Sequence, residues 1–302
     1  MLESLYIKNF RLFKELKIEH LGRVNLIVGR NNSGKTCLLE ALWIYGSYAD
    51  QAVLKKIIYQ RDEDWDDKSN EFRFYYNDNE NIIISPLQNG KKNWPTIELS
   101  IEKPNWLNSY GYEDFQKNTQ FVSTTMADQP VENLWNNIFV TPLEEYVLKG
   151  LRLFDQKIEK VGLIVKPDKN IPMIFLKNER IPLKHLGEGI SRVFHIILAL
   201  VNAKDSFLLI DEFENGLHYT VQPKVWELIF KLAKDLNVQV FATTHSWDCV
   251  TTFIETTQAN ETEGMLFNLG RSALKSNENK VIATAYDKDE LELVTQADLE
   301  VR

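Results

Sequence analysis

The segment GRNNSGKT at residues 29–36 constrains the fold of this chain more than any other feature. It has the form GxxxxGK[ST], in which the glycines allow the backbone N–H groups to point into one concavity. The loop follows the apolar, β-branched run Val24–Val28 and precedes a helical pattern from about Gly34 to Tyr45. This order of strand, glycine-rich loop and buried helix predicts an α/β fold with an anion site at the helix N-terminus.

The residue types in this loop match the needs of a nucleotide phosphate chain. Lys35 is expected to reach the β- and γ-phosphates, and the Thr36 hydroxyl is expected to bind Mg²⁺. The alternative is a glycine-rich turn that only caps a helix, but the buried strand before it and the buried helix after it favour the phosphate site. The other positions expected to bind the nucleotide are Gly29, Asn31, Asn32, Ser33, Gly34 and Cys37.

Two adjacent carboxylates follow the apolar run 207–210. That run shows no polar alternation, which is typical of a central parallel strand buried on both faces. Asp211 is predicted to hold Mg²⁺ through a water molecule, and Glu212 to orient and deprotonate an attacking water. The alternative is a solvated acidic loop at 211–214, which would be the better interpretation if the chain had no phosphate loop.

A histidine follows the next apolar run, 238–242. His245 lies in the sequence TTHS at 243–246 and is expected to donate a hydrogen bond to a γ-phosphate oxygen. A buried or helix-capping histidine is the alternative. Its place one strand after the carboxylate pair favours a role in catalysis.

These stretches, taken with three others, resemble the ABC-type ATPases. The likeness is carried by IKNFR at 7–11, LGEGISR at 186–192, DEFENGLH at 211–218, ATTHS at 242–246 and the ending DLEVR at 298–302. Within that class the chain is similar to the branch with SMC, Rad50, RecF and the OLD nucleases. It is most similar to the stand-alone bacterial AAA family ATPases of the AAA_15/AAA_21 type.

The resemblance implies a P-loop NTPase with an ABC-type head. Such a head has a mostly parallel central sheet, an antiparallel β subdomain and a mixed insertion. We expect residues 1–47 to form the N-terminal part of the core, 48–160 an insertion or lid, and 161–302 the C-terminal part. The aromatic residues of 94–135 are expected to form the insertion's own core. The alternative, stacking on nucleic-acid bases, lacks interleaved Lys and Arg.

The resemblance also implies that two copies close head to tail on ATP. The helix start at 187–192 would then meet the partner's γ-phosphate, with Gly187, Gly189 and Ser191 in contact and Arg192 as a catalytic charge acting in trans. The sequence departs here from the LSGG pattern, because Gly187 and Glu188 replace a serine and a glycine. An ordinary surface turn is the alternative. Arg11 is expected to contact phosphate or the base, or to be an exposed strand-end arginine.

Composition and charge exclude several other classes of protein. The chain has 302 residues, 35 Lys and Arg against 43 Asp and Glu, and a net charge of −8. Its hydrophobic content of 44% excludes a collagen or a disordered chain. The two distant cysteines predict neither a disulfide framework nor a zinc site, and no apolar run approaches the roughly 20 residues that span a bilayer. We expect a cytoplasmic protein with no membrane contact. The acidic balance disfavours a coat of nucleic acid but leaves a local basic groove open.

Three functions fit these features to different degrees. The first is an ATPase with Mg²⁺ as cofactor, working as a homodimer or higher homo-oligomer. The second is an ATP-dependent dimerisation switch with negligible turnover, which the unusual signature favours and Glu212 disfavours. The third, a transporter motor, lacks the LSGGQ signature. Because the chain shows no long heptad pattern and no nuclease domain, we expect a separate effector such as a nuclease or toxin, in DNA maintenance or anti-phage defence.

Overall fold

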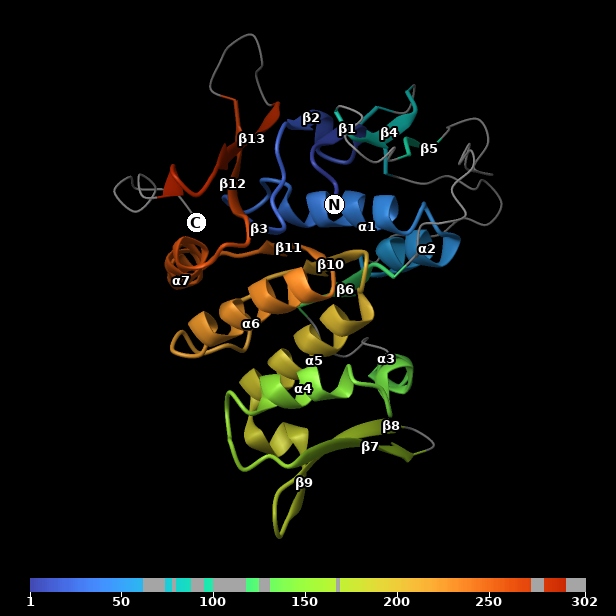
Figure 1. Ribbon diagram of the computed structural model, residues 1–302. Coiled ribbons are helices and arrows are strands. Elements are labelled where there is room, and N and C mark those ends of the chain that lie inside the picture. Colours follow the sequence, from blue (N-terminus) through green and yellow to red (C-terminus); the bar gives the residue numbers. More distant parts are fainter. Residues whose placement is uncertain are drawn as a thin grey trace.

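The elements of the chain stack in layers. The computed structural model describes residues 1–61, 74–77, 80–87, 95–99, 118–124, 131–166, 169–272 and 280–291. In Figure 1 an antiparallel sheet lies at the top, followed downward by helix α1, the central sheet, helices α6 and α5, and a smaller sheet at the bottom. The nucleotide motifs all belong to the central layers.

The central sheet is mostly parallel. Its strand order is β13-β12-β3-β11-β10-β6, and each neighbouring pair is parallel except β12 with β13. The predicted fold class is therefore confirmed. The strands are β3 (Val24–Val28), β6 (Gln120–Val122), β10 (Phe207–Ile210), β11 (Gln239–Thr243), β12 (Gly264–Arg271) and β13 (Val281–Tyr286).

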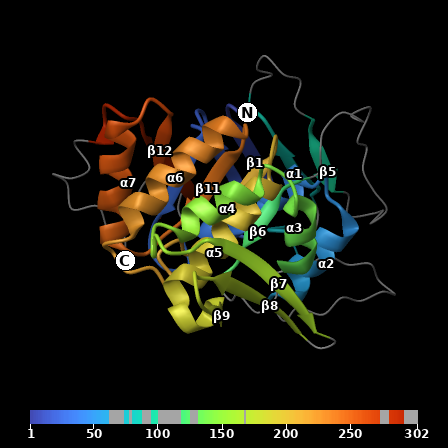
Figure 2. The same cartoon turned by 60° about the horizontal axis from the view of Figure 1, so that its bottom comes forward.

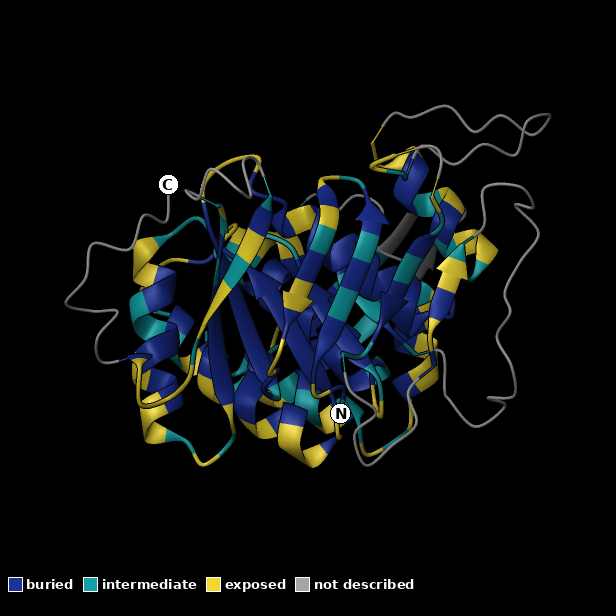
Figure 3. Ribbon diagram, turned by 90° about the horizontal axis from the view of Figure 1, so that it is seen from above, coloured by how far each residue is buried: buried dark blue, intermediate teal, exposed yellow. Residues whose placement is uncertain are grey.

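Each inner strand of this sheet contributes to two cores. In β3, Val24, Leu26 and Val28 face one core while Ile27 faces the other, because successive side chains point to opposite faces. Every residue of β3, β10 and β11 is buried, and Figure 3 shows buried strands beneath the outer ones. Burial on both faces explains why the apolar runs of the sequence show no polar alternation.

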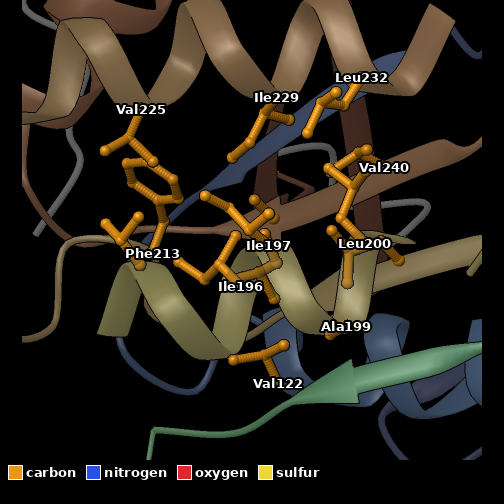
Figure 4. Packing of buried hydrophobic residues seen from close by; sticks show 14 of the residues in the cluster. Val122, Ile196, Ile197, Ala199, Leu200, Phe213, Val225, Ile229, Leu232 and Val240 are labelled. Atoms are coloured by element: carbon orange, nitrogen blue, oxygen red, sulfur yellow. The ribbon is translucent and has the colours of Figure 1, made fainter. Parts of the chain in front are cut away.

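One core lies between the sheet and the helices α5 (Glu188–Asn202) and α6 (Gln222–Asp235). Figure 4 shows Ile196 and Ile197 of α5 packed toward Ile229 of α6, with Val122 on the other side of α5. Helix α7 (Trp247–Ala259) lies beside α6, as Figure 2 also shows. Because the apolar side chains of α5 pack on the sheet, the N-terminus of α5 lies at the edge of the sheet where β10 ends.

The second core lies between the sheet and the antiparallel β subdomain. Helix α1 (Lys35–Gly46) runs through it, and of its twelve residues only Thr36 is not buried. The covering sheet has the order β2-β1-β4-β5. Its strands are β1 (Leu5–Phe10), β2 (Phe13–Ile18), β4 (Ile82–Ser85) and β5 (Ile97–Leu99), and α2 (Gln51–Tyr59) follows α1.

The described residues of the segment 48–160 contribute to three layers. Strands β4 and β5 extend the antiparallel sheet, β6 forms the edge of the central sheet, and α3 (Val131–Ile138) and α4 (Glu144–Leu151) pack on α5. Trp135 is 3% exposed and lies 6.2 Å from Phe194, ring to ring, so it belongs to the core beside α5. Phe121 of β6 stacks on Trp43 of α1, and the aromatic residues at positions 94, 106, 110, 112 and 115 lie outside the described residues.

The lower lobe completes the fold. Strands β7 (Lys160–Lys166), β8 (Lys169–Phe175) and β9 (Arg180–Pro182) form an antiparallel sheet, and the short 3₁₀ helix η2 (Leu183–Leu186) leads into α5. Within the described ranges, no helix is both long and apolar enough to cross a membrane.

Candidate nucleotide site

The motifs predicted from the sequence meet at one edge of the central sheet. Strands β3, β11 and β10 are parallel neighbours, so the loops that follow them emerge at the same edge. Backbone hydrogen bonds join these loops: Thr244 N donates to Ile27 O at 3.1 Å, and Phe213 N donates to Thr243 O at 2.9 Å. The phosphate loop, the carboxylate pair and the histidine segment therefore form one site.

The phosphate loop requires glycine at both of its ends. Gly29 has φ of +146° and Gly34 has φ of +102°, a region that other residues rarely adopt. A Cβ at Gly34 would lie 2.9 Å from the Phe13 ring, and one at Gly29 would collide with the Leu269 carbonyl oxygen. Ser33 Oγ is buried and has no hydrogen-bond partner among the described residues. The cradle and this unpaired hydroxyl fit a phosphate.

Lys35 lies at the first position of α1 with its ammonium group turned back into the loop. Its Nζ donates to Gly29 O at 2.6 Å and to Arg30 O at 3.0 Å. Burial lowers the Lys35 pKa to about 8, against the opposing influence of Asp211, Glu212 and Glu214. The ammonium group is held by neutral carbonyls only, so phosphate oxygens would be stronger partners. Asn31 and Asn32 are exposed beside it, and Asn32 has φ of +61°.

Thr36 and Asp211 face each other across the site. The Thr36 hydroxyl lies 3.5 and 3.4 Å from the two carboxylate oxygens of Asp211. Hydroxyl and carboxylate oxygens are the ligands that Mg²⁺ prefers, and Mg²⁺ in such sites is completed by water and substrate phosphates. Among the described residues no group of three or more His, Cys, Asp or Glu could hold a metal alone. The donor set fits a Mg²⁺ ion that arrives with a phosphate chain.

Glu212 has an unusual backbone that its neighbours hold in place. Its φ is +48°, which is uncommon for a residue other than glycine and costs on the order of 1–3 kcal/mol. Its N–H donates to Thr243 Oγ1 at 2.9 Å, and the same hydroxyl donates to Asp211 Oδ1 at 2.6 Å. Thr243 is fully buried at the end of β11. It therefore fixes both carboxylate residues relative to the neighbouring strand.

The segment with His245 is tied to the carboxylate loop by Glu214. The two carboxylate oxygens of Glu214 accept hydrogen bonds from the Thr244 hydroxyl and the His245 N–H, both at 2.7 Å. The ring of His245 is half-buried at the sheet edge. This arrangement joins the backbone of the histidine segment to the loop that carries the carboxylate pair, and the role of the His245 side chain stays a prediction.

The helix start at 187–192 lies against the same edge from below. Gly187 is exposed with φ of +101°, and Glu188 begins α5. Gly189 packs so closely that a Cβ there would lie 3.0 Å from Gly216 O. Ser191 is 6% exposed and its hydroxyl donates to Gly187 O at 3.2 Å. Gly187 and Glu188 are the exposed residues of this segment, while the Ser191 hydroxyl turns inward.

Arg192 does not lie where the sequence analysis expected it. The side chain is 0% exposed, and its guanidinium donates to Ser123 O at 2.6 Å, Asp211 O at 2.7 Å and Glu212 O at 3.0 Å. A buried group bonded to three carbonyls of its own chain cannot reach a nucleotide on a partner. The predicted trans-acting charge is wrong for this reason, and so is the alternative of a solvated surface arginine.

Arg11 is likewise held within the chain. Its Nε lies 2.7 Å from Glu40 Oε2, and its guanidinium carbon lies 4.8 Å from the centre of the Phe74 ring. The alternative of an exposed arginine is wrong, because the side chain is only 8% exposed. The predicted contact with nucleotide stays a prediction and would require this ion pair to open. Cys37 is also buried, with its sulfur 3.6 Å from Arg61 Nη2, and burial raises the pKa of its thiol.

Sequence reasoning missed three residues of the site: Thr243, Glu214 and Ser123. Both Thr243 and Glu214 were within the quoted motifs: Thr243 directly follows the apolar run 238–242, and Glu214 lies two residues after the carboxylate pair. Their polar character at a strand end was a usable signal. Ser123 follows β6, a strand of only three residues, and nothing in its sequence indicated its position.

Comparison with known proteins identifies an ATPase family. The family model described as "AAA ATPase domain" (AAA_15) matches residues 1–140 and 113–250. A curated relative from Helicobacter pylori named "ATP/GTP phosphatase" is 27% identical over 83% of this chain and 86% of its own length. The "DNA double-strand break repair Rad50 ATPase" of Archaeoglobus fulgidus is 43% identical over 56 residues, which cover 18% of this chain and 6% of that protein.

A solved structure shows the same fold at low sequence identity. The SMC head domain from Thermotoga maritima superposes with a TM-score of 0.52 and 16% identity, covering 93% of this chain and 97% of that one. The fold described above is thus shared with an SMC head.

Proposed function

This chain belongs to the AAA ATPase domain family, and we propose that two copies of it bind and hydrolyse Mg-ATP between them, head to tail. The observation that carries this proposal is the pairing of Thr36 with Asp211 at 3.4 Å. It joins the phosphate loop after β3 to the carboxylate pair after β10. Such a pairing has no evident use in a loop that only caps a helix.

The chain's own residues supply the groups that phosphoryl transfer needs. Thr36 and Asp211 would hold Mg²⁺, which when bound neutralises charge on the phosphates. Lys35 would leave the Gly29 and Arg30 carbonyls for the β- and γ-phosphate oxygens. Glu212 would hold the attacking water and accept its proton. As the bond from the water oxygen to the γ-phosphorus forms, the bond to the β-phosphate oxygen breaks and ADP leaves.

His245 would donate to a γ-phosphate oxygen from the next loop. Glu214 supports this role, since it fixes the His245 backbone to the loop of Glu212. Phosphoryl transfer depends mainly on positioning and on stabilising charge, so a site held by hydrogen bonds between loops suits it.

The second copy would close the site with its helix start. Helix α5 has fifteen residues, and the N–H groups of its first turn carry the positive end of the helix dipole. Gly187 is exposed and leaves these groups uncovered by a side chain. In our proposal they approach the γ-phosphate held by the partner's phosphate loop.

A second function, an ATP-dependent dimerisation switch with negligible turnover, is favoured by one observation. Because Arg192 is buried in its own subunit, the helix start brings backbone N–H groups but not this cation to the partner's phosphate. Loss of such a trans charge would slow hydrolysis without preventing ATP from joining two copies. Glu212 favours hydrolysis instead, because its left-handed backbone conformation is held in place and its carboxylate is expected to act as the base.

We place the ATP cycle in DNA maintenance or anti-phage defence, beside a separate effector such as a nuclease or toxin. The names of the Rad50 and RecF relatives support the first setting. Pure protein is then expected to hydrolyse ATP slowly and to leave plasmid DNA intact. Metal-dependent cleavage of plasmid by the pure chain would contradict this assignment.

The proposal is tested by light scattering of the Glu212→Gln protein with and without Mg-ATP. This substitution keeps the shape of the side chain and removes the base, so ATP should remain bound. We expect the mass to double with ATP and to stay unchanged with ADP. The matched control, Glu212→Gln with Lys35→Ala, should not dimerise. An ATP-independent mass for Glu212→Gln would contradict the head-to-tail dimer.

A further inference from the structure

Arg192 is fully buried and donates to three carbonyls at the site, and the proposed mechanism does not use it. Its guanidinium bonds to carbonyls at the ends of two strands, Ser123 O after β6 and Asp211 O and Glu212 O after β10. Burial lowers the Arg192 pKa to about 10, with Asp211, Glu214 and Glu212 opposing the shift, so the group is charged at neutral pH. A buried cation is costly unless it is well paired, which indicates a role that offsets the cost.

The backbone of Glu212 depends on this contact. Its N–H is held by Thr243 and its carbonyl by Arg192, so both polar groups of a left-handed residue are anchored. The carboxylate expected to act as base is attached to the same residue. Loss of the carbonyl contact would free the peptide to relax to an ordinary φ, which would redirect the side chain.

The start of α5 also packs directly on the loop that follows Glu212. A Cβ at Gly189 would lie 3.0 Å from Gly216 O, and one at Gly216 would lie 3.7 Å from Glu188 Cβ. Arg192 lies one turn further along the same helix. Two contacts, one of backbone and one of the guanidinium, therefore join the helix start to the loop of residues 211–216.

We infer that Arg192 is a positioning residue that acts within its own subunit. It holds the Asp211–Glu212 backbone to the start of α5, so that this helix start and the loop with the metal ligand and base move as one body. Since the proposed dimer brings the same helix start to the partner's ATP, arrival of that ATP would be transmitted through Arg192 to the base of the subunit's own site. The second part rests on the proposed function, whereas the first does not.

The first test needs no nucleotide. Hydrogen–deuterium exchange is measured on the full chain for the wild type and for Arg192→Met, which keeps an unbranched, though shorter, side chain and has no donors. We expect exchange at residues 211–217 to accelerate by about tenfold or more, while residues 24–34 of the β3 and phosphate-loop region stay unchanged. The control Lys231→Met removes an exposed cation of α6. Unchanged exchange at 211–217 would overturn the inference.

Arg192→Lys provides a milder variant if the methionine protein does not fold. Lysine keeps the charge and can reach one or two of the three carbonyls, so intermediate exchange is expected. In steady-state kinetics both variants should lower kcat while KM for ATP stays within about twofold, because the phosphate loop is untouched. A rise in KM with kcat unchanged would contradict the positioning role.

The second test uses mixed dimers with one live site. One subunit carries Lys35→Ala, so the only working site is the phosphate loop and base of the other subunit closed by the first subunit's α5. We place Arg192→Met in either subunit and compare turnover. The inference predicts a loss about fivefold or more greater when the substitution shares a chain with the live Glu212. Equal losses, or a greater loss in the other chain, would overturn it.

The two tests separate failure of this inference from failure of the proposed function. If the Glu212→Gln protein does not dimerise with ATP and the wild-type protein does not turn ATP over, the head-to-tail ATPase is wrong. The exchange experiment then decides the local role of Arg192 alone. If the dimers are active and the asymmetry is absent, the inference fails and the ATPase stands.

Discussion

Lys35 and Arg192 are both buried cations that donate to backbone carbonyls at the same edge of the sheet, yet their surroundings differ. Lys35 bonds to carbonyls five and six residues earlier in its own loop. Arg192 bonds to carbonyls 19, 20 and 69 residues away. The first contact lies within one turn of chain, while the second joins three separate elements.

This difference teaches which cation can move and which cannot. A flexible lysine held by two neighbouring carbonyls can exchange them for phosphate oxygens without disturbing any other element. The planar fork of an arginine with carbonyls of two strands cannot leave without opening the core between them. Lys35 is thus suited to bind substrate, and Arg192 to hold the loop that acts on it.

The largest effect is expected for Lys35→Ala. Turnover should fall by about 100-fold or more and ATP should bind weakly, because the charge that faces the phosphates is lost. Thermal unfolding should change less than for Arg192→Met, since only two carbonyls of one loop lose a partner. Parallel assays of turnover and unfolding temperature check the pair of outcomes. Normal turnover would contradict the assignment of residues 29–36 as the phosphate loop.

Arg192→Met should show the opposite combination, a clear loss of stability with little change in ATP binding. Three carbonyls lose a charged donor, so the free energy of unfolding should fall by about 3 kcal/mol. Binding of a fluorescent ATP analogue to the monomer should remain within about twofold. Denaturant unfolding and fluorescence titration give the two numbers. A variant as stable as the wild type would make the contact with Ser123, Asp211 and Glu212 dispensable.

Glu214→Gln should lower turnover by a smaller amount, again by weakening contacts between two separate loops. Its amide can still accept one of the two hydrogen bonds from Thr244 and His245, but it no longer carries the charge. We expect turnover to fall by about tenfold with ATP affinity unchanged, since one charged hydrogen bond is worth about 1.5–3 kcal/mol. Glu227→Gln, at an exposed position of α6, is the matched control. Equal turnover in the two variants would show that Glu214 does not contribute to catalysis.

The smallest effect is expected at the surface pair of Glu15 and Lys280, which lie 2.6 Å apart between β2 and the start of β13. Hydrogen bonds from Lys280 and Lys17 lower the Glu15 pKa to about 2 from an ordinary value of 4.5. A lowered carboxyl pKa stabilises the fold above pH 4.5, and this contribution disappears as the pH falls toward 2.

Glu15→Gln measures that contribution. Because the pair is partly exposed, the variant should lose less than about 1 kcal/mol at pH 7, and the difference from wild type should vanish near pH 2. Unfolding curves at several pH values check the trend, with the exposed Glu19→Gln as control. A difference that grew toward acid would reverse the sign of the argument.

Whether a helix or strand could be predicted depended on how far apart in the sequence the residues that stabilise it lie. Strands β3, β10 and β11 were predicted to within a residue or so, because their runs of apolar residues report burial on both faces. Strand β6 was missed, since three residues carry no pattern and its place depends on pairing with β10. Helices α3 and α4 were missed for a related reason. Each is short, and its apolar side chains are buried only because α5 packs against them.

The sequence by itself determined the phosphate loop, the parallel strands and the residues that end them. These features depend on neighbours within about eight residues, which is the range over which glycine freedom, strand alternation and helix periodicity act. Only the tertiary structure decided that Arg192 faces inward, that Thr243 bridges Asp211 and Glu212, and that Glu214 holds the His245 segment. Each of those contacts joins groups from separate strands or helices, so it exists only after the sheet has brought their ends together.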